Sequence, residues 1–407
     1  MDPILEEWGS FLLRWVHVVT AIAWIGASFY FMHLDASLRP TPSLPAGKGG
    51  EAWEVHGGGF YQVQKYMVAP AHMPEHLIWH KWQSYSTWIS GFFLLCWIYY
   101  GSPDLYLIDP AIRDIGPAGA AAVGIGGLLV GWVFYDQLCK SRLGNNDFRL
   151  GAVLFVFVVA VAFIFQQVFS GRGAMLHTGA VMATIMTANV AMNIIPGQRK
   201  VVAALKAGQE PDPAIGKAAK QRSTHNNYLT LPVLFFMMSN HYPHTWSTRW
   251  AWVIVALVLV AGALVRHFYN VRHSGGGDSW WMWGAAAACV LLAVGISYTS
   301  SPLGRERLGL SAVAAPVEVA SAAPAAPAEA VEIVVSRCSM CHAAEPVWTG
   351  IAIAPKGVML DTPERIARQA EAIRYHAVLT ASMPPNNITG LEPEERRTLA
   401  EWLAKVR

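Results

Sequence analysis

Long apolar runs are the feature of this sequence that most restricts the folds open to it. Two examples are GAAAVGIGGLLVGWVFY at 119–135 and GAVLFVFVVAVAFIFQQVF at 151–169. Because about 20 helical residues cross the hydrocarbon core of a bilayer, runs of this length predict transmembrane helices. The composition agrees, since 54% of the residues are hydrophobic and 14% are charged, against about a quarter charged in soluble domains. About eight spans are predicted, over 11–34, 78–100, 117–138, 150–169, 175–195, 222–240, 250–271 and 280–299.

Two of these spans leave a choice of interpretation. The first is too long for a signal peptide and follows no positively charged segment, so we interpret it as a transmembrane helix. The sixth has a short apolar core and contains Pro232, so it is either continuous or a broken helix. Interrupted helices often build binding sites in membrane proteins, which draws attention to this segment.

The basic residues of the loops predict the orientation in the membrane. Loops after even-numbered spans hold only Arg113, Arg172 and Arg249, whereas loops after odd-numbered spans hold most of the lysines and arginines. By the positive-inside rule the odd loops face the cytoplasm, and an even number of spans then places both termini outside. In a bacterium this is the periplasmic side of the inner membrane. The net charge of +3 gives no support for a nucleic-acid partner.

The chain changes character after residue 300. Residues 1–300 form the predicted transmembrane domain, and 301–330 form a linker rich in Ala and Pro. Residues 331–407 are predicted to form a small domain of several short helices. The fold class is therefore all-α, a polytopic transmembrane helix bundle followed by a small helical domain.

The small domain begins with the motif CSMCH at 338–342. Its spacing is that of a c-type haem attachment site, in which Cys338 and Cys341 bind the haem covalently. His342, which follows directly, is then placed to ligate the iron. A disulfide or half of a zinc site are the other uses of such a cysteine pair. No second CxxC accompanies it, and the predicted periplasmic location agrees with haem attachment.

A second iron ligand is expected from a later loop. Met383, in ASMPPNN at 381–387, is the candidate, and the prolines after it stiffen the backbone. A thioether opposite histidine raises the reduction potential of a haem, which suits an electron acceptor. The last stretch, EPEERRTLAEWLAKV, predicts an amphipathic helix that starts near Pro393 and buries Leu399, Trp402 and Leu403.

Histidines and asparagines near the cytoplasmic ends of the spans are candidates for substrate chemistry. His76 and His80 are four residues apart at the predicted start of the second helix, which places them on one face. Flanking tryptophans also suit an interfacial belt. In STHNNYLTLP, the side chains of His225, Asn226 and Asn227 could bind the edge of a polar heterocycle. Helix capping is the other interpretation of this stretch.

Two histidines fall in the outer leaflet on the predicted topology. His17 and His177 each need a hydrogen-bond partner or an iron there, because polar groups are costly in the bilayer. We consider haem b, held by His17 and His177, as a relay to the small domain. The other interpretation is a hydrogen bond from each histidine to a neighbouring helix.

Five segments together resemble the bacterial membrane-bound urate hydroxylases, in which a multi-span urate-oxidase domain is fused to a cytochrome c. The resemblance covers nearly the whole chain, and the stretches HNNYLTLP and NIIPGQRK are its most specific parts. In order, the five segments are WVHVVTAIAWIGASFYFMHLD, HLIWHKWQSYSTWISG, TANVAMNIIPGQRKVV, HNNYLTLPVLFFMMSNHYP and CSMCH. One departure is that the family usually has Phe and Glu where His80 and Gln83 stand. If that Glu is a catalytic base in the family, Gln83 cannot act in the same way.

This resemblance implies oxidation of urate to 5-hydroxyisourate, with electrons passing to the cytochrome c domain. A periplasmic cytochrome or a terminal respiratory oxidase would be the acceptor. His76 and His225 are then candidates for the general base, since the histidine pKa lies near working pH, and Asn226 and Asn227 for binding urate. Two other functions remain open on the residues alone. One is a dehydrogenase for quinol or another small molecule, and the other is a non-enzymatic haem c conduit.

Overall fold

The computed structural model is mostly helical and describes residues 3–42, 44, 48–66, 73–110, 112–310, 326–349, 351, 354–355 and 358–404. In these residues the longer helices are α1 (Pro3–Ser37), α2 (Trp82–Leu94), α4 (Pro117–Lys140), α5 (Asp147–Gln166), α6 (Gly171–Ala188), α7 (Ile195–Lys206), α8 (Pro213–Ser239), α9 (Ala251–His273) and α10 (Trp281–Ser300). A short helix, α3 (Pro103–Tyr106), lies between α2 and α4. Two π-helices extend the long ones, η1 (Leu95–Tyr100) after α2 and η3 (Asn189–Ile194) between α6 and α7.

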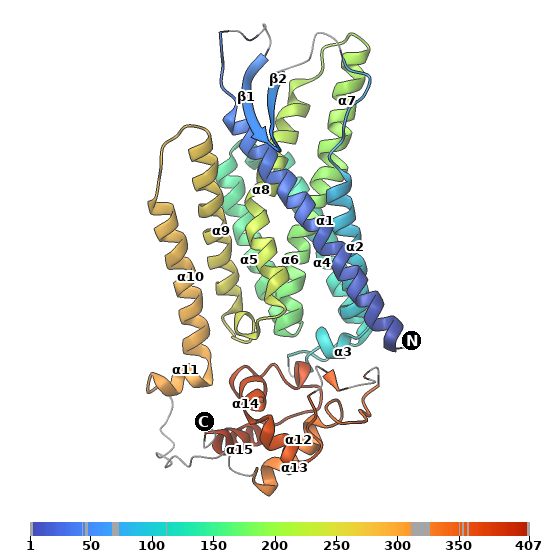
Figure 1. The fold of residues 1–407 in the computed structure, drawn as a ribbon, viewed down its shortest axis with the longest axis vertical. Helices are drawn as coiled ribbons and strands as arrows, with labels where there is room; N and C mark the ends of the chain where they lie inside the picture. Colours follow the sequence, from blue (N-terminus) through green and yellow to red (C-terminus); the bar gives the residue numbers. More distant parts are fainter. Residues whose placement is uncertain are drawn as a thin grey trace.

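The long helices run side by side as a bundle (Figure 1). Six helical segments of the described chain are long and apolar enough to cross a membrane: Trp8–Ser37, Pro117–Lys140, Asp147–Gln166, Gly171–Lys206, Ala251–His273 and Trp281–Ser300. The segments predicted as the second and sixth spans are also helical, but α2 is short and α8 is rich in polar residues. Leu291 on α10 is 70% exposed, as expected of a side chain that faces lipid. The six apolar helices indicate a membrane protein.

Helix α8 is continuous through Pro232, so the segment is not a broken helix. Helix α9 passes close to this proline, because a Cβ at Gly262 would lie 2.7 Å from the Pro232 ring. The glycine thus permits the contact between α8 and α9, one of the main helix pairs around the candidate site.

A β-hairpin that the sequence analysis did not predict follows α1. Strand β1 (Lys48–His56) pairs antiparallel with β2 (Gly59–Tyr66). Gly57 and Gly58 form the two-residue turn with φ of +60° and +82°, a conformation that glycine adopts without strain and that suits a tight hairpin. The Gly57-Gly58 pair is therefore the sequence feature from which this hairpin could be predicted.

The C-terminal residues form a separate hydrophobic core. It includes α12 (Ala328–Cys338), α13 (Pro363–Arg368), α14 (Ala370–Ile373) and α15 (Pro393–Leu403). The last helix begins at Pro393 and buries Leu399, Trp402 and Leu403, as predicted. Helix α12 starts within the predicted linker, as does α11 (Pro302–Arg307), and 311–325 of that linker lie outside the described residues.

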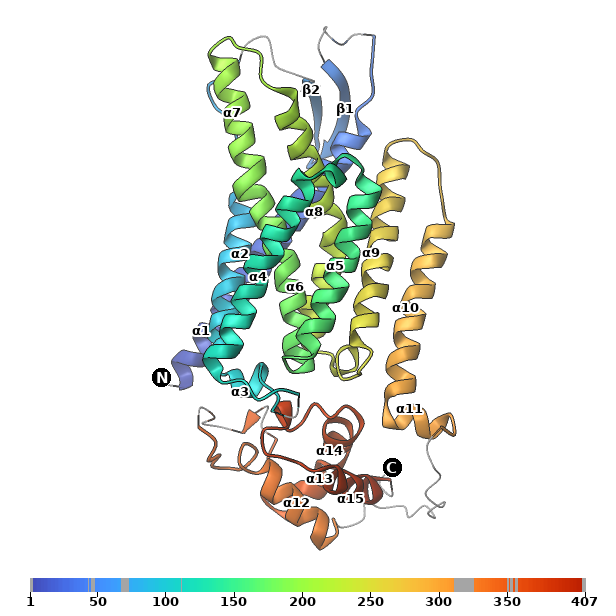
Figure 2. The same ribbon diagram turned by 180° about the vertical axis from the view of Figure 1, so that it is seen from behind.

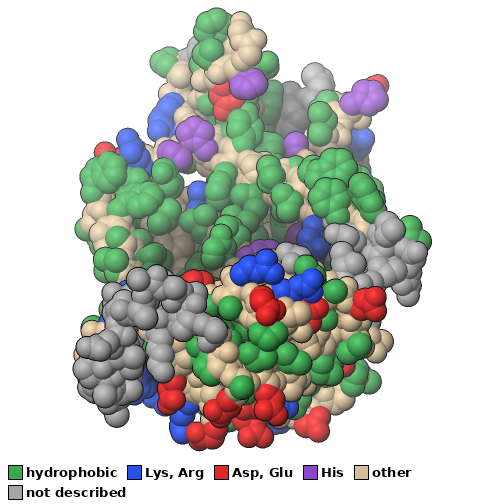
Figure 3. Space-filling model, turned by 60° about the horizontal axis from the view of Figure 1, so that its bottom comes forward, with side chains coloured by type: hydrophobic (Ala, Val, Ile, Leu, Met, Phe, Trp, Pro, Cys, Tyr) green, Lys and Arg blue, Asp and Glu red, His purple; other side chains and the backbone are tan. Residues whose placement is uncertain are grey.

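The C-terminal part lies under one end of the bundle, beside α3 and α11, and the hairpin lies at the other end (Figures 1 and 2). Both chain termini are at the end that carries the C-terminal part. Figure 3 shows acidic side chains on the outer surface of this part and hydrophobic side chains over the helices above it. The Asn386 amide donates to the Asp104 carbonyl at 3.1 Å, which ties the two parts together.

Candidate functional site

A buried ion pair joins α4 and α8 at the bundle end far from the C-terminal part. The Arg222 guanidinium, 3% exposed, donates to the Asp136 carboxylate at 2.9 Å. It also donates to the side-chain oxygen of Asn189 in η3 at 3.1 Å. Charges are costly in a membrane protein unless they are paired, so this pair is a fixed part of the fold.

The same network includes two of the predicted site residues. Asn189 donates through its amide to Asn226 at 2.9 Å and to the Tyr135 hydroxyl at 3.1 Å. The Tyr135 hydroxyl is also 2.8 Å from Nδ1 of His225, and since it accepts from Asn189 it can donate to that nitrogen. Asn189 lies in a π-helix, a local geometry that is frequent at functional sites. The structure therefore brings His225 and Asn226 together.

Asn227 belongs to a different group of residues. Successive helical residues point about 100° apart, so Asn227 faces α9 instead of α4. Its side-chain oxygen accepts from Arg266 and from Asn270, each at 3.2 Å. Its amide nitrogen is buried and donates to none of the described residues. Helix α8 thus carries candidate polar groups on more than one face.

His76 does not join either group. The predicted second helix begins at Trp82, four residues later than expected, and His76 is exposed in an irregular segment. The placement of His76 and His80 on one helical face is therefore wrong. Pro74 and the mixed polar and aromatic residues after it do not continue a helical pattern. His80 packs against Phe31, with ring centroids 4.8 Å apart.

The two histidines considered for haem b have protein partners. Nδ1 of His177 contacts the Gly173 carbonyl at 2.8 Å, and Nε2 contacts the Tyr100 hydroxyl at 3.1 Å. The rings of Phe165 and Phe169 also lie against His177, which is fully buried. His17 contacts the Thr87 carbonyl across the α1–α2 interface at 2.9 Å. Both ring nitrogens of His177 are therefore engaged in a packed interior, whereas the contacts of His17 use Nδ1 alone.

The cysteine motif lies at the C-terminal end of α12. Cys338 and Cys341 are free cysteines in this structure, which gives no support to a disulfide between them. Across the described residues, no three His, Cys, Asp or Glu side chains are grouped as a metal site would need. The zinc interpretation is therefore unsupported there.

The residues around this motif fit a haem c. Nδ1 of His342 donates to the Val358 carbonyl at 2.9 Å, which leaves Nε2 as the nitrogen that can ligate a metal. Met383 is partly exposed, and its carbonyl accepts from the Arg396 guanidinium at 3.1 Å. The buried indole nitrogen of Trp402 has no described hydrogen-bond partner, so a polar group of a bound cofactor could use it.

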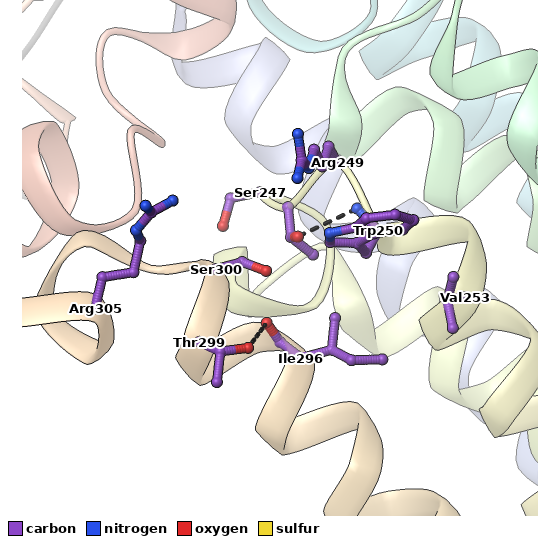
Figure 4. Close-up of a pocket in the computed structure, with 9 residues that line it drawn as sticks. Ser247, Arg249, Trp250, Val253, Ile296, Thr299, Ser300 and Arg305 are labelled. Carbon is purple, nitrogen blue, oxygen red and sulfur yellow. Dashed lines mark hydrogen bonds between the residues drawn. The ribbon is translucent and has the colours of Figure 1, made fainter. Parts of the chain in front are cut away.

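A cavity of about 670 Å³ opens at the bundle end that faces the C-terminal part (Figure 4). Ser247, Arg249 and Trp250 line it from the segment before α9, while Ser300 and Arg305 line it from the end of α10 and from α11. None of the predicted site residues borders it. The cavity is therefore not evidence for the predicted catalytic and binding residues.

Sequence reasoning missed the partners in both polar groups on α8. Tyr135, Asp136, Asn189 and Arg266 were not singled out, although each lies within an apolar helix. An ionisable residue in such a helix is itself a functional signal. Asp136 and Arg266 were therefore detectable from the sequence, whereas the identity of their partners depends on the packing of helices.

Comparison with known proteins identifies a family. The family model described as urate oxidase N-terminal matches residues 3–297, which include nearly the whole helix bundle and both polar groups on α8. No curated protein and no solved structure matches the chain. Because the matched residues are well over half of the 407 in the sequence, the chain belongs to the urate oxidase N-terminal family.

Proposed function

We propose that this protein oxidises urate to 5-hydroxyisourate in a bacterial inner membrane and passes the electrons to a haem c on its C-terminal domain. The observation that carries the proposal is the family match over residues 3–297. It suggests a urate-related oxidoreductase, and the buried polar groups on α8 offer amides and a guanidinium of the kind that bind polar heterocycles.

The domains follow from this proposal: 1–300 oxidises urate, 301–330 links, and 331–407 carries the haem in the periplasm. In addition to the six apolar helices, α2 and α8 cross the membrane, which gives eight spans. Support comes from the basic loops and from the position of both termini at one end of the bundle.

The reaction balances with water as the source of oxygen. Adding a hydroxyl group to urate from water releases two electrons and two protons, so hydrogen peroxide is not a product. Haem c, held by Cys338, Cys341, His342 and Met383, would accept electrons one at a time when bound. A periplasmic cytochrome or a respiratory oxidase then takes them away.

The test is an anaerobic visible spectrum of the purified, detergent-solubilised protein before and after addition of urate. We expect the reduced haem c bands to appear with urate and not with xanthine, which lacks only the C8 oxygen. Analysis of the product under the same conditions should show 5-hydroxyisourate. Reduction by dithionite but not by urate would disprove the proposal. Reduction by a quinol instead would favour the dehydrogenase alternative, and reduction by no metabolite would favour a conduit.

A further inference from the structure

Arg266 is a buried cation for which the described part of the chain supplies no counter-ion. It lies on α9 and is 8% exposed. Its Nε donates to the Asn227 oxygen at 3.2 Å, and its guanidinium carbon is 4.0 Å from the centre of the Phe29 ring. The other buried arginine, Arg222, is matched by Asp136 at 2.9 Å. A buried charge without such a partner is strongly unfavourable, so the group has a reason to bind an anion.

The groups of Asn227 and Arg266 that remain unused are hydrogen-bond donors. The Asn227 oxygen is saturated by Arg266 and Asn270, which fixes the orientation of its amide. The amide nitrogen of Asn227 is then buried without a described partner, and the terminal nitrogens of Arg266 donate to none of the described side chains. A positive charge beside unused donors is complementary to an anion that carries acceptor oxygens.

We propose that Arg266 and Asn227 bind the urate anion between α8 and α9, with Phe29 of α1 against the guanidinium. This inference rests on the proposed function and locates its substrate. Urate is a planar anion with carbonyl oxygens at its edges, and the flat guanidinium fork suits such an edge by paired hydrogen bonds. His225 contacts Tyr135 of α4, and Asn226 bonds with Asn189 of η3 and with the Met186 carbonyl of α6, so their network positions the helix and does not touch urate.

Two variants separate binding from folding. Arg266→Gln removes the charge, and we expect it to weaken urate binding about 10- to 100-fold, as for loss of charged hydrogen bonds. Asn227→Asp supplies the missing counter-ion, so it should abolish urate binding while it keeps or raises the thermal unfolding midpoint. A purely structural role for Arg266 would leave binding by both folded variants unchanged. Arg272→Gln is the matched control, because Arg272 is on the same helix and is exposed and paired with Asp278.

Binding is measured by calorimetry with the full-length, dithionite-reduced protein without oxygen, so that no turnover occurs. The inference holds if Arg266→Gln and Asn227→Asp weaken binding and Arg272→Gln does not. It is overturned if either of the first two variants binds urate as the wild type does. It is also overturned if inorganic phosphate stabilises the wild type through Arg266 while urate binding is unaffected by the variants. If the wild-type haem is reduced by urate but the variants bind normally, this site alone is wrong; if urate neither binds nor reduces the wild type, the proposed function fails.

Discussion

Three consecutive residues of α8 have different partners. His225 contacts Tyr135 on α4, Asn226 bonds with Asn189 of η3, and Asn227 bonds with Arg266 of α9. Each side chain is therefore held by a separate element of the bundle. Loss of one of these contacts should affect one face of α8 and leave the contacts on the other faces intact.

The Asp136–Arg222 pair gives a prediction about stability. In Asp136→Asn the guanidinium of Arg222 stays buried without its carboxylate, and we expect the free energy of unfolding to fall by about 3–5 kcal/mol. Titration with dodecyl sulfate in mixed micelles measures this change. Asp278→Asn is the control, since its exposed pair with Arg272 should contribute less than about 1 kcal/mol. Equal effects of the two substitutions would contradict the prediction.

Asp361 gives a prediction about pH. The Ala344 backbone N–H and the Arg365 guanidinium both donate to the Asp361 carboxylate, and in that order they lower its pKa below the usual range. A lowered pKa in the folded state stabilises the protein above the pKa of the unfolded chain, about 3.9. That contribution is lost as the pH falls through the lowered value. The carboxylate closes the loop that follows His342 in the chain.

We therefore expect Asp361→Asn to destabilise the C-terminal domain at pH 6 and to match the wild type at a pH below its folded pKa. Denaturant unfolding between pH 6 and pH 2, followed by absorption of the haem c that we propose this domain binds, checks this. A constant difference across that range would show that Asp361 does not act through its charge.

At the scale of elements, the contact between α8 and α9 depends on a glycine opposite a proline. Pro232 presents a rigid ring, and Gly262 lets α9 approach it. The contact holds α8 and α9 in one register. It thereby aligns Asn227 on α8 with Arg266, which lies four residues after Gly262 on α9. Close packing of this kind tolerates added volume poorly.

Gly262→Ala should destabilise the bundle by about 1–3 kcal/mol, because the new methyl would overlap the Pro232 ring. Gly295→Ala on α10 is the matched control, since nothing lies within 4 Å of the added carbon. It should be neutral or slightly stabilising. Thermal unfolding of both variants, together with urate binding, makes the comparison. If Gly262→Ala does not change the stability, α9 can move away from Pro232 and make room for the added methyl group.

These elements show what the sequence alone could predict. The period of α15 predicts that Leu399, Trp402 and Leu403 are buried, and they are, because a regular amphipathic pattern determines one buried face. The start of α2 was misplaced by four residues, since no such pattern crosses the segment around His76. The sequence does not predict that Asn226 and Asn227 have different partners, because this depends on which helices flank α8.

At the scale of the whole molecule, the C-terminal part contacts the bundle through a few polar and aromatic residues. Asn386 donates to the Asp104 carbonyl at 3.1 Å, and the rings of Tyr375 and His244 are 5.4 Å apart. The φ of Asn386 is +53°, a conformation that asparagine tolerates. The segment that follows Met383 therefore faces the helix bundle.

Asn386→Asp keeps the shape and the backbone preference but removes the donor and places a charge beside a carbonyl. We expect a loss of about 0.5–1.5 kcal/mol of docking energy. Hydrogen exchange should increase at 103–106 and at 385–388 while the core of the C-terminal domain stays protected. Asn387→Asp serves as a comparison, since the Asn387 amide bonds within its own domain to Leu391. Unchanged exchange at 103–106 would argue against this docking contact.

The arrangement of the two ends has an electrical consequence. Arg266 is 15 residues along α9 from Ala251, which places it about 20 Å from the end where the C-terminal part lies. On the proposed topology, each electron taken from urate there travels outward through the membrane voltage. That voltage contributes about 2.3 kcal/mol per charge per 100 mV for a full crossing. A charged membrane would accelerate urate oxidation, and each turnover would in return partly discharge the membrane.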